Sequence, residues 1–309
     1  MAEKSDSVHY PRSGAQETGV FDAEAQHRIE RGNPVVQAAR AALFNRALQP
    51  PREAHGHAAI ERIQRGLNMY LGKLPREWPH PLQRPTFLLI PGLEPKPWFE
   101  RERFPFLDAI EAETDAIRAE MLAVLTEGSE LEPTVAMRED APAAKIWGGL
   151  LNSPRWSAYH LYRDGEPIEE HARRCPRTMA ALDAMPIVRI PEHSPLAMFS
   201  VLRPRTHIPP HTGVINVRLI VHLPLVVPPD CGMLRAGGEA RPWVEGRAMV
   251  FDDTIAHEAW NDTDETRVVL IFDIWNPLLT EVEQQAIVVA IGAIDQFRHR
   301  YGARDEWHE

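Results

Sequence analysis

Cysteine is scarce in this chain, with two residues among 309. Cys175 and Cys231 are far apart, and neither belongs to a Cys-x-x-Cys pair. The sequence therefore offers neither a disulfide framework nor a cysteine-based zinc site. So few cysteines are typical of a protein kept in a reducing compartment, and we expect a cytoplasmic protein.

Basic residues and long apolar runs are also in short supply. The chain has 34 Lys and Arg residues against 44 Asp and Glu, which gives a net charge of -10 at pH 7. Nucleic-acid binding needs clustered basic side chains, so we expect no nucleic-acid partner. No apolar run approaches the ~18 residues of a membrane helix, and the polar N-terminal stretch lacks the apolar segment of a secretory signal. We therefore expect no membrane partner.

Hydrophobic residues make up 44% of the chain, enough for a packed core. Residues 1–20 are polar and aperiodic, which predicts a disordered tail. Residues 21–75 predict a helical N-terminal extension with helices over 22–48 and 58–71, which packs on the rest of the chain or self-associates into a homo-oligomer. Residues 76–309 are expected to form a single larger domain that ends in a C-terminal helix over 280–301.

The region from residue 76 onward mixes helices with short strands. Helices are predicted over 106–125 and 167–185, and strands over 87–91 and 156–162. From residue 198, strand-like runs are separated by Pro, Gly, Asn and Asp, over 198–203, 217–226, 231–236, 248–251, 257–261 and 267–275. A helix over 280–301 follows, with a Thr280–Glu283 capping box. Many short strands with turn signals predict a sandwich or barrel, so the fold class is α+β.

Two histidines in the strand-rich region are candidate iron ligands. His211 and His257 lie 46 residues apart, and the intervening strands can bring them together. Imidazole suits Fe(II), and a non-haem iron site needs protein ligands on one face only. The usual third ligand is a carboxylate two residues after the first histidine, but Gly213 stands there. Either two histidines and water suffice, or a carboxylate comes from elsewhere.

Acidic residues near His257 are the candidates for that carboxylate. Asp252 and Asp253 precede the histidine closely, and either could instead orient a loop or an imidazole ring. Glu258 is a poor co-ligand of His257, because neighbouring residues of a strand point to opposite faces.

An anion pocket is predicted beside the metal. Arg267 begins the apolar strand VVLIF, where a buried guanidinium favours a planar anionic partner such as a dicarboxylate. Ser200 could donate a hydroxyl to the same carboxylate. Arg218 and His222 are four residues apart and share one strand face, so we expect them at the metal-proximal end of the same ligand.

These residues lie in motifs that resemble the aspartyl/asparaginyl β-hydroxylase family. The resemblance runs through FSVLRPRTHIPPHTGVINVRLIVHLPLVVP, WVEGRAMVFDDTIAHEAWND and TRVVLIFDIWNPLLT, and it is close over residues 198–280. It implies a double-stranded β-helix (jelly-roll, cupin-like) core and the use of Fe(II), 2-oxoglutarate and O2. By resemblance, His211 and His257 hold iron, Ser200 and Arg267 hold the distal carboxylate of 2-oxoglutarate, and His222 approaches its metal end.

Two positions bear on this resemblance. Gly213 agrees with animal members of the family, which use two histidines. Ile220 stands where animal members carry an arginine, so either Arg218 compensates or the cosubstrate is held differently.

The resemblance implies a hydroxylase that releases succinate and CO2. An aspartyl or asparaginyl side chain or a related small molecule is the expected substrate, presented by a peptide, a protein or a metabolite. Two alternatives remain open from the sequence: a non-catalytic partner-binding protein on a jelly-roll scaffold, and a metal-dependent cupin-like isomerase or hydrolase.

Overall fold

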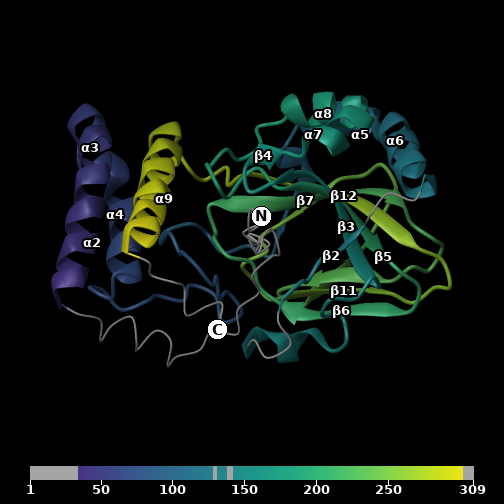
Figure 1. Cartoon of the computed structure of the whole chain (residues 1–309), viewed down its shortest axis with the longest axis horizontal. Coiled ribbons are helices and arrows are strands. Elements are labelled where there is room, and N and C mark those ends of the chain that lie inside the picture. The colour runs from purple at the N-terminus through teal and green to yellow at the C-terminus, as the bar shows by residue number, and fades with distance from the viewer. Residues whose placement is uncertain (1–33, 128–130, 138–141, 302–309) are drawn as a thin grey trace, which may run out of the picture.

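The computed structural model describes residues 34–127, 131–137 and 142–301. The strands form two facing antiparallel sheets, and a group of helices stands beside them (Figure 1). The predicted tail 1–20 and the first part of the predicted helix 22–48 lie outside the described residues. The jelly-roll core that the resemblance implies is confirmed by this arrangement of sheets.

The larger sheet has the strand order β1-β10-β7-β12-β5-β3-β2, with β4 paired to β3. Its strands are β1 (Trp98–Phe99), β2 (Glu132–Pro133), β3 (Trp156–Arg163), β4 (Glu166–Pro167), β5 (Ala197–Leu202), β7 (Arg218–Val226), β10 (Met249–Phe251) and β12 (Arg267–Trp275). The smaller sheet has the order β6-β11-β8-β9. Its strands are β6 (Thr206–His211), β8 (Met233–Ala236), β9 (Glu239–Pro242) and β11 (His257–Asn261).

Alternation along the strands of the larger sheet separates its two faces. On β12, Leu270 and Phe272 belong to a core shared with the helices outside the sheet, and Val269 and Ile271 belong to the core between the sheets. The covering helices are α5 (Leu107–Ala112), α6 (Thr114–Thr126), α7 (Glu169–Arg174) and α8 (Pro176–Asp183). Each large apolar side chain buried in this way stabilises the fold by ~1.5–3 kcal/mol. Arg267 alternates with the outward residues, so it faces the interior.

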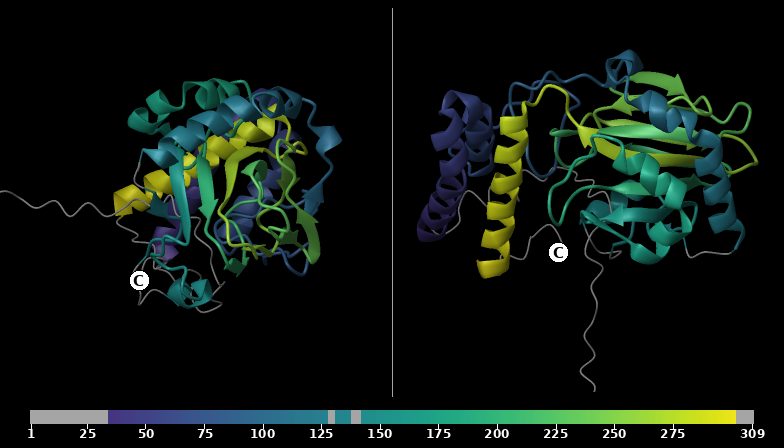
Figure 2. Two further views of the ribbon diagram at one scale, coloured as in Figure 1. Left: turned by 90° about the vertical axis from the view of Figure 1, so that its right-hand side faces the viewer. Right: turned by 90° about the horizontal axis from the view of Figure 1, so that it is seen from above.

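The N-terminal extension packs against the C-terminal helix (Figure 2). Its elements are α2 (Pro34–Ala47), α3 (Gln49–His55), the 3-10 turn η1 (Ala58–Ile60) and α4 (Glu61–Tyr70). Residues of α2, η1 and α4 share an apolar core with α9 (Glu281–Tyr301), whereas α3 has no buried residue. The capping box at the start of α9 is confirmed, because Thr280 N donates to Glu283 Oε2 (2.8 Å) and Glu283 N donates to Thr280 Oγ1 (3.3 Å). None of the described helices is long and apolar enough to cross a bilayer.

Several local predictions differ from the structure. The predicted helix 106–125 is divided into α5 and α6, and the region 167–185 holds the two helices α7 and α8. Pro50 and Pro51 do not end the helical region but open α3, since the first turn of a helix needs no proline N–H. The predicted strand 87–91 is reduced to one bridge between Leu88 and Ile215. The sequence does not predict strands β6 and β9, nor the two-residue strands β1, β2 and β4.

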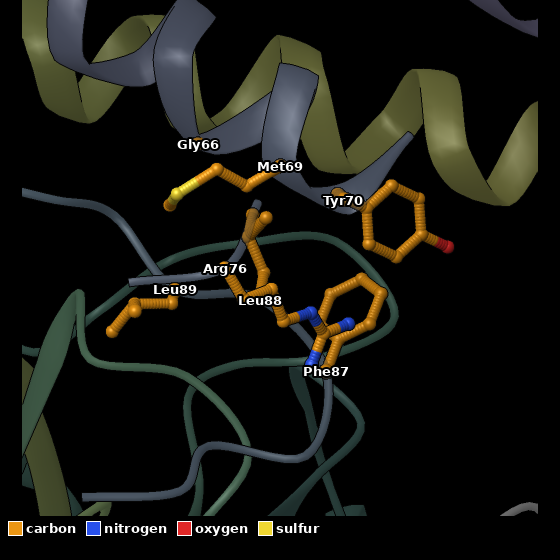
Figure 3. A pocket seen from close by; sticks show the side chains of 7 residues that line it. All are labelled: Gly66, Met69, Tyr70, Arg76, Phe87, Leu88 and Leu89. Carbon is orange, nitrogen blue, oxygen red and sulfur yellow. The ribbon is translucent and has the colours of Figure 1, made fainter. Parts of the chain in front are cut away.

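A shallow hollow marks the seam between the helices and the jelly-roll (Figure 3). It is lined by Gly66, Met69, Tyr70, Arg76, Phe87, Leu88 and Leu89. The backbone comes close here, since a Cβ added at Gly66 would lie 2.8 Å from Ile90 Cδ1 and 3.0 Å from the Leu89 carbonyl oxygen. None of the predicted site residues lines this hollow, which is therefore a packing seam.

Candidate functional site

Strand register brings the two predicted metal ligands together. His211 ends β6, His257 begins β11, and the two residues are direct partners in the antiparallel pairing. Their ring centroids lie 4.1 Å apart, and both side chains are buried. Because the rings lie this close, the two imidazoles can share one metal ion.

Backbone carbonyls fix both imidazole rings. The Nδ1 atoms lie 2.7 Å from the Pro209 oxygen in His211 and 3.1 Å from the Ile255 oxygen in His257. A carbonyl only accepts, so each Nδ1 carries the proton and each Nε2 keeps its lone pair. Burial lowers the pKa of His257 to about 4 and the pKa of His211 well below its ordinary value. Both rings are therefore neutral near pH 7, the form that binds metal.

Within the described ranges, the two histidines have no third protein ligand beside them. Among the residues that the structure describes, no group of three His, Cys, Asp or Glu side chains could hold a metal ion. Glu258 points away, as its strand position predicts, and pairs with His207 and Arg235. The candidate centre is thus a two-histidine site, one of the two options left open by the sequence.

The space beside Gly213 is taken by Asp253. A Cβ on Gly213 would lie 2.2 Å from Asp253 Oδ2, and the Gly213 amide donates to the Asp253 carbonyl at 2.7 Å. Burial raises the pKa of Asp253, and neither of its carboxylate oxygens has a hydrogen-bond donor. A carboxylate from a different strand connection therefore occupies the position where a side chain at residue 213 would stand.

Gly213→Ala is expected to destabilise the fold through this contact. Displacing a buried carboxylate resembles overpacking and should lower the free energy of unfolding by ~1–3 kcal/mol. In Gly213→Ala/Asp253→Ala the obstructing side chain is gone, so the double variant should be more stable than the two single effects added together. Urea unfolding of all four proteins measures this coupling, and strict additivity would contradict it.

A buried cation without an acidic partner lies at the other end of the interior. Arg267 is 1% exposed, its Nε has no hydrogen-bond acceptor, and its NH1 reaches only the Ser200 carbonyl at 3.4 Å. The Trp243 ring lies 4.7 Å from the guanidinium carbon. Burial lowers the pKa of Arg267 to about 10, so it stays charged at pH 7. An isolated buried charge is costly, and such a site is built for an anion.

Neighbouring strands bring the other predicted pocket residues to this cation. Val269, two residues after Arg267, pairs with Ser200 on β5, and the Ser200 hydroxyl accepts from Trp156 Nε1 at 3.2 Å. His222 pairs with Ile271 on β12. Burial lowers the pKa of His222 well below its ordinary value, and the nearby Arg267 and His257 lower it further. His222 is therefore close enough to interact with both the candidate metal ligand His257 and the buried cation Arg267.

Arg218 is held by carboxylates. It is buried on the same strand as His222, but its guanidinium lies 3.1 Å from Asp273 and 3.6 Å from Asp253. Its charge is therefore compensated within the protein. The structure brings Arg218 to the Asp253 side of the metal centre, while Arg267 stands alone.

Aromatic residues that the sequence did not single out as functional complete the walls. The Trp147 ring lies tilted at 5.2 Å from that of His211, and the Phe251 ring lies 5.2 Å from that of His257 and 5.1 Å from that of His222. The Trp243 ring lies against the Arg267 guanidinium. Trp147 lies in the 3-10 turn η3 (Pro142–Trp147), more than 60 residues before His211 in the sequence. No local sequence pattern therefore predicts its contact with His211.

Another buried histidine gives a pH dependence that is separate from metal binding. Burial lowers the pKa of His160 to about 3, and its Nδ1 has no partner. The unfolded chain takes up a proton near pH 6.5 while the folded chain does not, so stability is lost as the pH falls below 6.5. His160→Met should remove about 2 kcal/mol of this loss between pH 7.5 and pH 5. Urea unfolding at both pH values tests this, and parallel losses in wild type and variant would contradict it.

The fold and the site together describe a jelly-roll protein with two paired, buried histidines as a candidate metal centre and a buried arginine as a candidate anion site. A model of the aspartyl/asparaginyl beta-hydroxylase family matches residues 111–277. The chain belongs to this family of hydroxylases, which are 2-oxoglutarate-dependent dioxygenases.

Two relatives that match this chain are also hydroxylases. An ornithine lipid ester-linked acyl 2-hydroxylase of Rhizobium tropici is 36% identical over 59% of this chain and 61% of its own length. Human aspartyl/asparaginyl beta-hydroxylase is 29% identical over 64% of this chain and 25% of its own length. The chain thus matches only part of each. A prolyl-4-hydroxylase structure from Pseudomonas putida is 21% identical over 55% of this chain and 87% of its own, with a TM-score of 0.36 that adds nothing to the assignment.

Proposed function

We propose that this chain is an Fe(II)- and 2-oxoglutarate-dependent hydroxylase that consumes O2 and releases succinate and CO2. His211 and His257 hold the iron through Nε2. Arg267 and Ser200 bind the distal carboxylate of 2-oxoglutarate, and His222 lies beside the metal end of that ligand. Bound Fe(II) and 2-oxoglutarate supply the oxidising chemistry, and the protein positions both and excludes water.

The observation that carries this proposal is the uncompensated charge of Arg267. A buried guanidinium with a free Nε and no carboxylate partner needs an anion from outside the chain. It shares an interior with two neutral imidazoles whose Nδ1 atoms are held by backbone carbonyls, which leaves the Nε2 lone pairs for a metal. A keto diacid satisfies both, because one end chelates the metal and the other pairs with the arginine.

Asp253 and Arg218 have a supporting role in this proposal. Asp253 lies against Gly213, two residues after His211, and the Arg218 guanidinium lies 3.6 Å from the same carboxylate. Asp253 would accept a hydrogen bond from water on the metal, and Arg218 would keep it in place. This departs from the prediction that Arg218 contacts the cosubstrate directly.

The two candidate substrates are those given in the names of the relatives. An aspartyl or asparaginyl side chain, or a related small molecule, follows from human aspartyl/asparaginyl beta-hydroxylase. A lipid-linked acyl chain is the second candidate, because the Rhizobium tropici relative has the higher sequence identity.

Coupled turnover tests the function. Protein loaded anaerobically with Fe(II) and then given 2-oxoglutarate and O2 should form succinate as O2 is consumed, and Zn(II)-loaded protein should not. Turnover that proceeds equally with Zn(II) would favour an isomerase or hydrolase, and failure to bind 2-oxoglutarate would favour a binding protein. With candidate peptides and acyl lipids added, the hydroxylated substrate is the one that gains the mass of one oxygen.

A further inference from the structure

Trp147 places an unsatisfied hydrogen-bond donor beside the metal centre. Its side chain is 0% exposed, and its Nε1–H has no acceptor within the described part of the chain. A buried N–H left without an acceptor costs about 1–3 kcal/mol. An oxygen atom of a bound ligand would satisfy this donor. The Arg267 guanidinium, at the opposite end of the interior, likewise has a buried donor without an acceptor.

The position of Trp147 links the metal to the anion pocket. Its ring centroid lies 5.2 Å from that of His211 and 5.8 Å from that of Trp156. Trp156 in turn donates to Ser200, whose carbonyl accepts from Arg267. Of the described side chains with an unpartnered buried polar atom, Trp147 is the one with a ring contact to a metal-ligand histidine.

The distribution of positive charge leaves this end of the site without a free cation. Arg218 and Arg267 are the buried arginine or lysine side chains among the described residues. Arg267 stands beside Ser200, and Arg218 is engaged by Asp253 and Asp273. Ile220, on the same strand as Arg218 and His222, lies in the apolar core between the sheets. A diacid that pairs one carboxylate with Arg267 therefore needs a neutral donor for the other.

We propose that the Trp147 indole N–H donates a hydrogen bond to the metal-proximal carboxylate of the keto acid. This inference rests on the proposed function, since it presupposes that a keto acid lies between His211 and Arg267. In this arrangement the two carboxylates are recognised differently: a guanidinium binds the distal one, and the metal and an indole N–H bind the proximal one. A keto acid without a distal carboxylate keeps the Trp147 contact and loses the Arg267 contact.

Two ligands and two variants separate these contacts. The Zn(II)-loaded protein is titrated by calorimetry with 2-oxoglutarate and with 2-oxopentanoate, which has the same chain without the distal carboxylate. Trp147→Phe keeps an aromatic ring and removes the N–H, so it should weaken both ligands about tenfold or more. Arg267→Met should weaken 2-oxoglutarate alone. Trp98→Phe is the matched control, because that buried indole donates to the Glu239 carbonyl and should leave both affinities unchanged.

Each outcome decides a separate question. Wild-type affinity of Trp147→Phe for both ligands would overturn the assignment of Trp147. Loss of 2-oxoglutarate binding alone in that variant would place the indole at the distal carboxylate and also overturn it. If the wild-type protein binds neither ligand, the proposed function fails before Trp147 is tested. If Trp147→Phe does not unfold cooperatively, Trp147→Tyr takes its place. Nuclear magnetic resonance gives a second readout: the indole 1H–15N signal of Trp147, identified by its absence from the variant, should shift in wild type when 2-oxoglutarate is added.

Discussion

Replacement of His211 or His257 by alanine is expected to abolish iron binding and turnover. The centre has two protein ligands among the described residues, so either change removes half of them. Loss of a supporting residue around a metal ligand costs about 10–100-fold in affinity, and loss of a ligand itself should exceed ~100-fold. The measurement is metal content after equilibration with Fe(II) under argon, together with succinate formation.

The fold should survive either change. Both imidazoles are buried and neutral, and each contributes one hydrogen bond to a carbonyl. His207→Ala is the matched control, since His207 lies on β6 with His211 but is exposed and pairs with Glu258. Near-full activity in either ligand variant, or equal loss in His207→Ala, would remove these histidines from the metal centre.

Arg267→Met is expected to separate ligand binding from stability. A charge-assisted hydrogen bond contributes about 1.5–3 kcal/mol, so the dissociation constant for 2-oxoglutarate should rise at least about tenfold. The free energy of unfolding of the ligand-free protein should not fall. Methionine removes a buried charge that lacks an acidic partner, and this gain offsets the contact with Trp243.

The control for Arg267 is Arg235, an exposed arginine that also lies against a tryptophan ring. Arg235 stacks on Trp260 at 5.0 Å and pairs with Glu258, so Arg235→Met also loses a cation–π contact but leaves the interior intact. Calorimetric titration with 2-oxoglutarate and urea unfolding are carried out on both variants. An unchanged affinity in Arg267→Met would take this residue out of the cosubstrate pocket, and a large loss of stability would mean that its charge is satisfied within the fold.

The strands that carry the site could be predicted where they lie inside a sheet. The bounds of β11 and β12 match the prediction, because apolar runs there end at clear turn residues. Strand β6 was missed although it carries His211. Pro209 and Pro210 argue against a strand in general, but β6 lies at the edge of the smaller sheet, where proline is tolerated.

Contacts between distant segments set the limit of the sequence-based interpretation. The rule that residues four apart share a strand face correctly places Arg218 and His222 together. It does not reveal that two carboxylates compensate the charge of Arg218. These are Asp253, in the connection between β10 and β11, and Asp273, on β12. Asp253 stands over Gly213 because of the register between β6 and β11 and the path of the chain before His257, and no local pattern encodes that approach.

The most direct test of the central claim is a crystal structure with Mn(II) and N-oxalylglycine, read from the anomalous signal of the metal. The proposed function predicts one metal peak bonded to Nε2 of both His211 and His257, with the distal carboxylate of the ligand paired to the Arg267 guanidinium. A metal bound by only one of these imidazoles or elsewhere in the chain, or an Arg267 that faces no carboxylate, would contradict it.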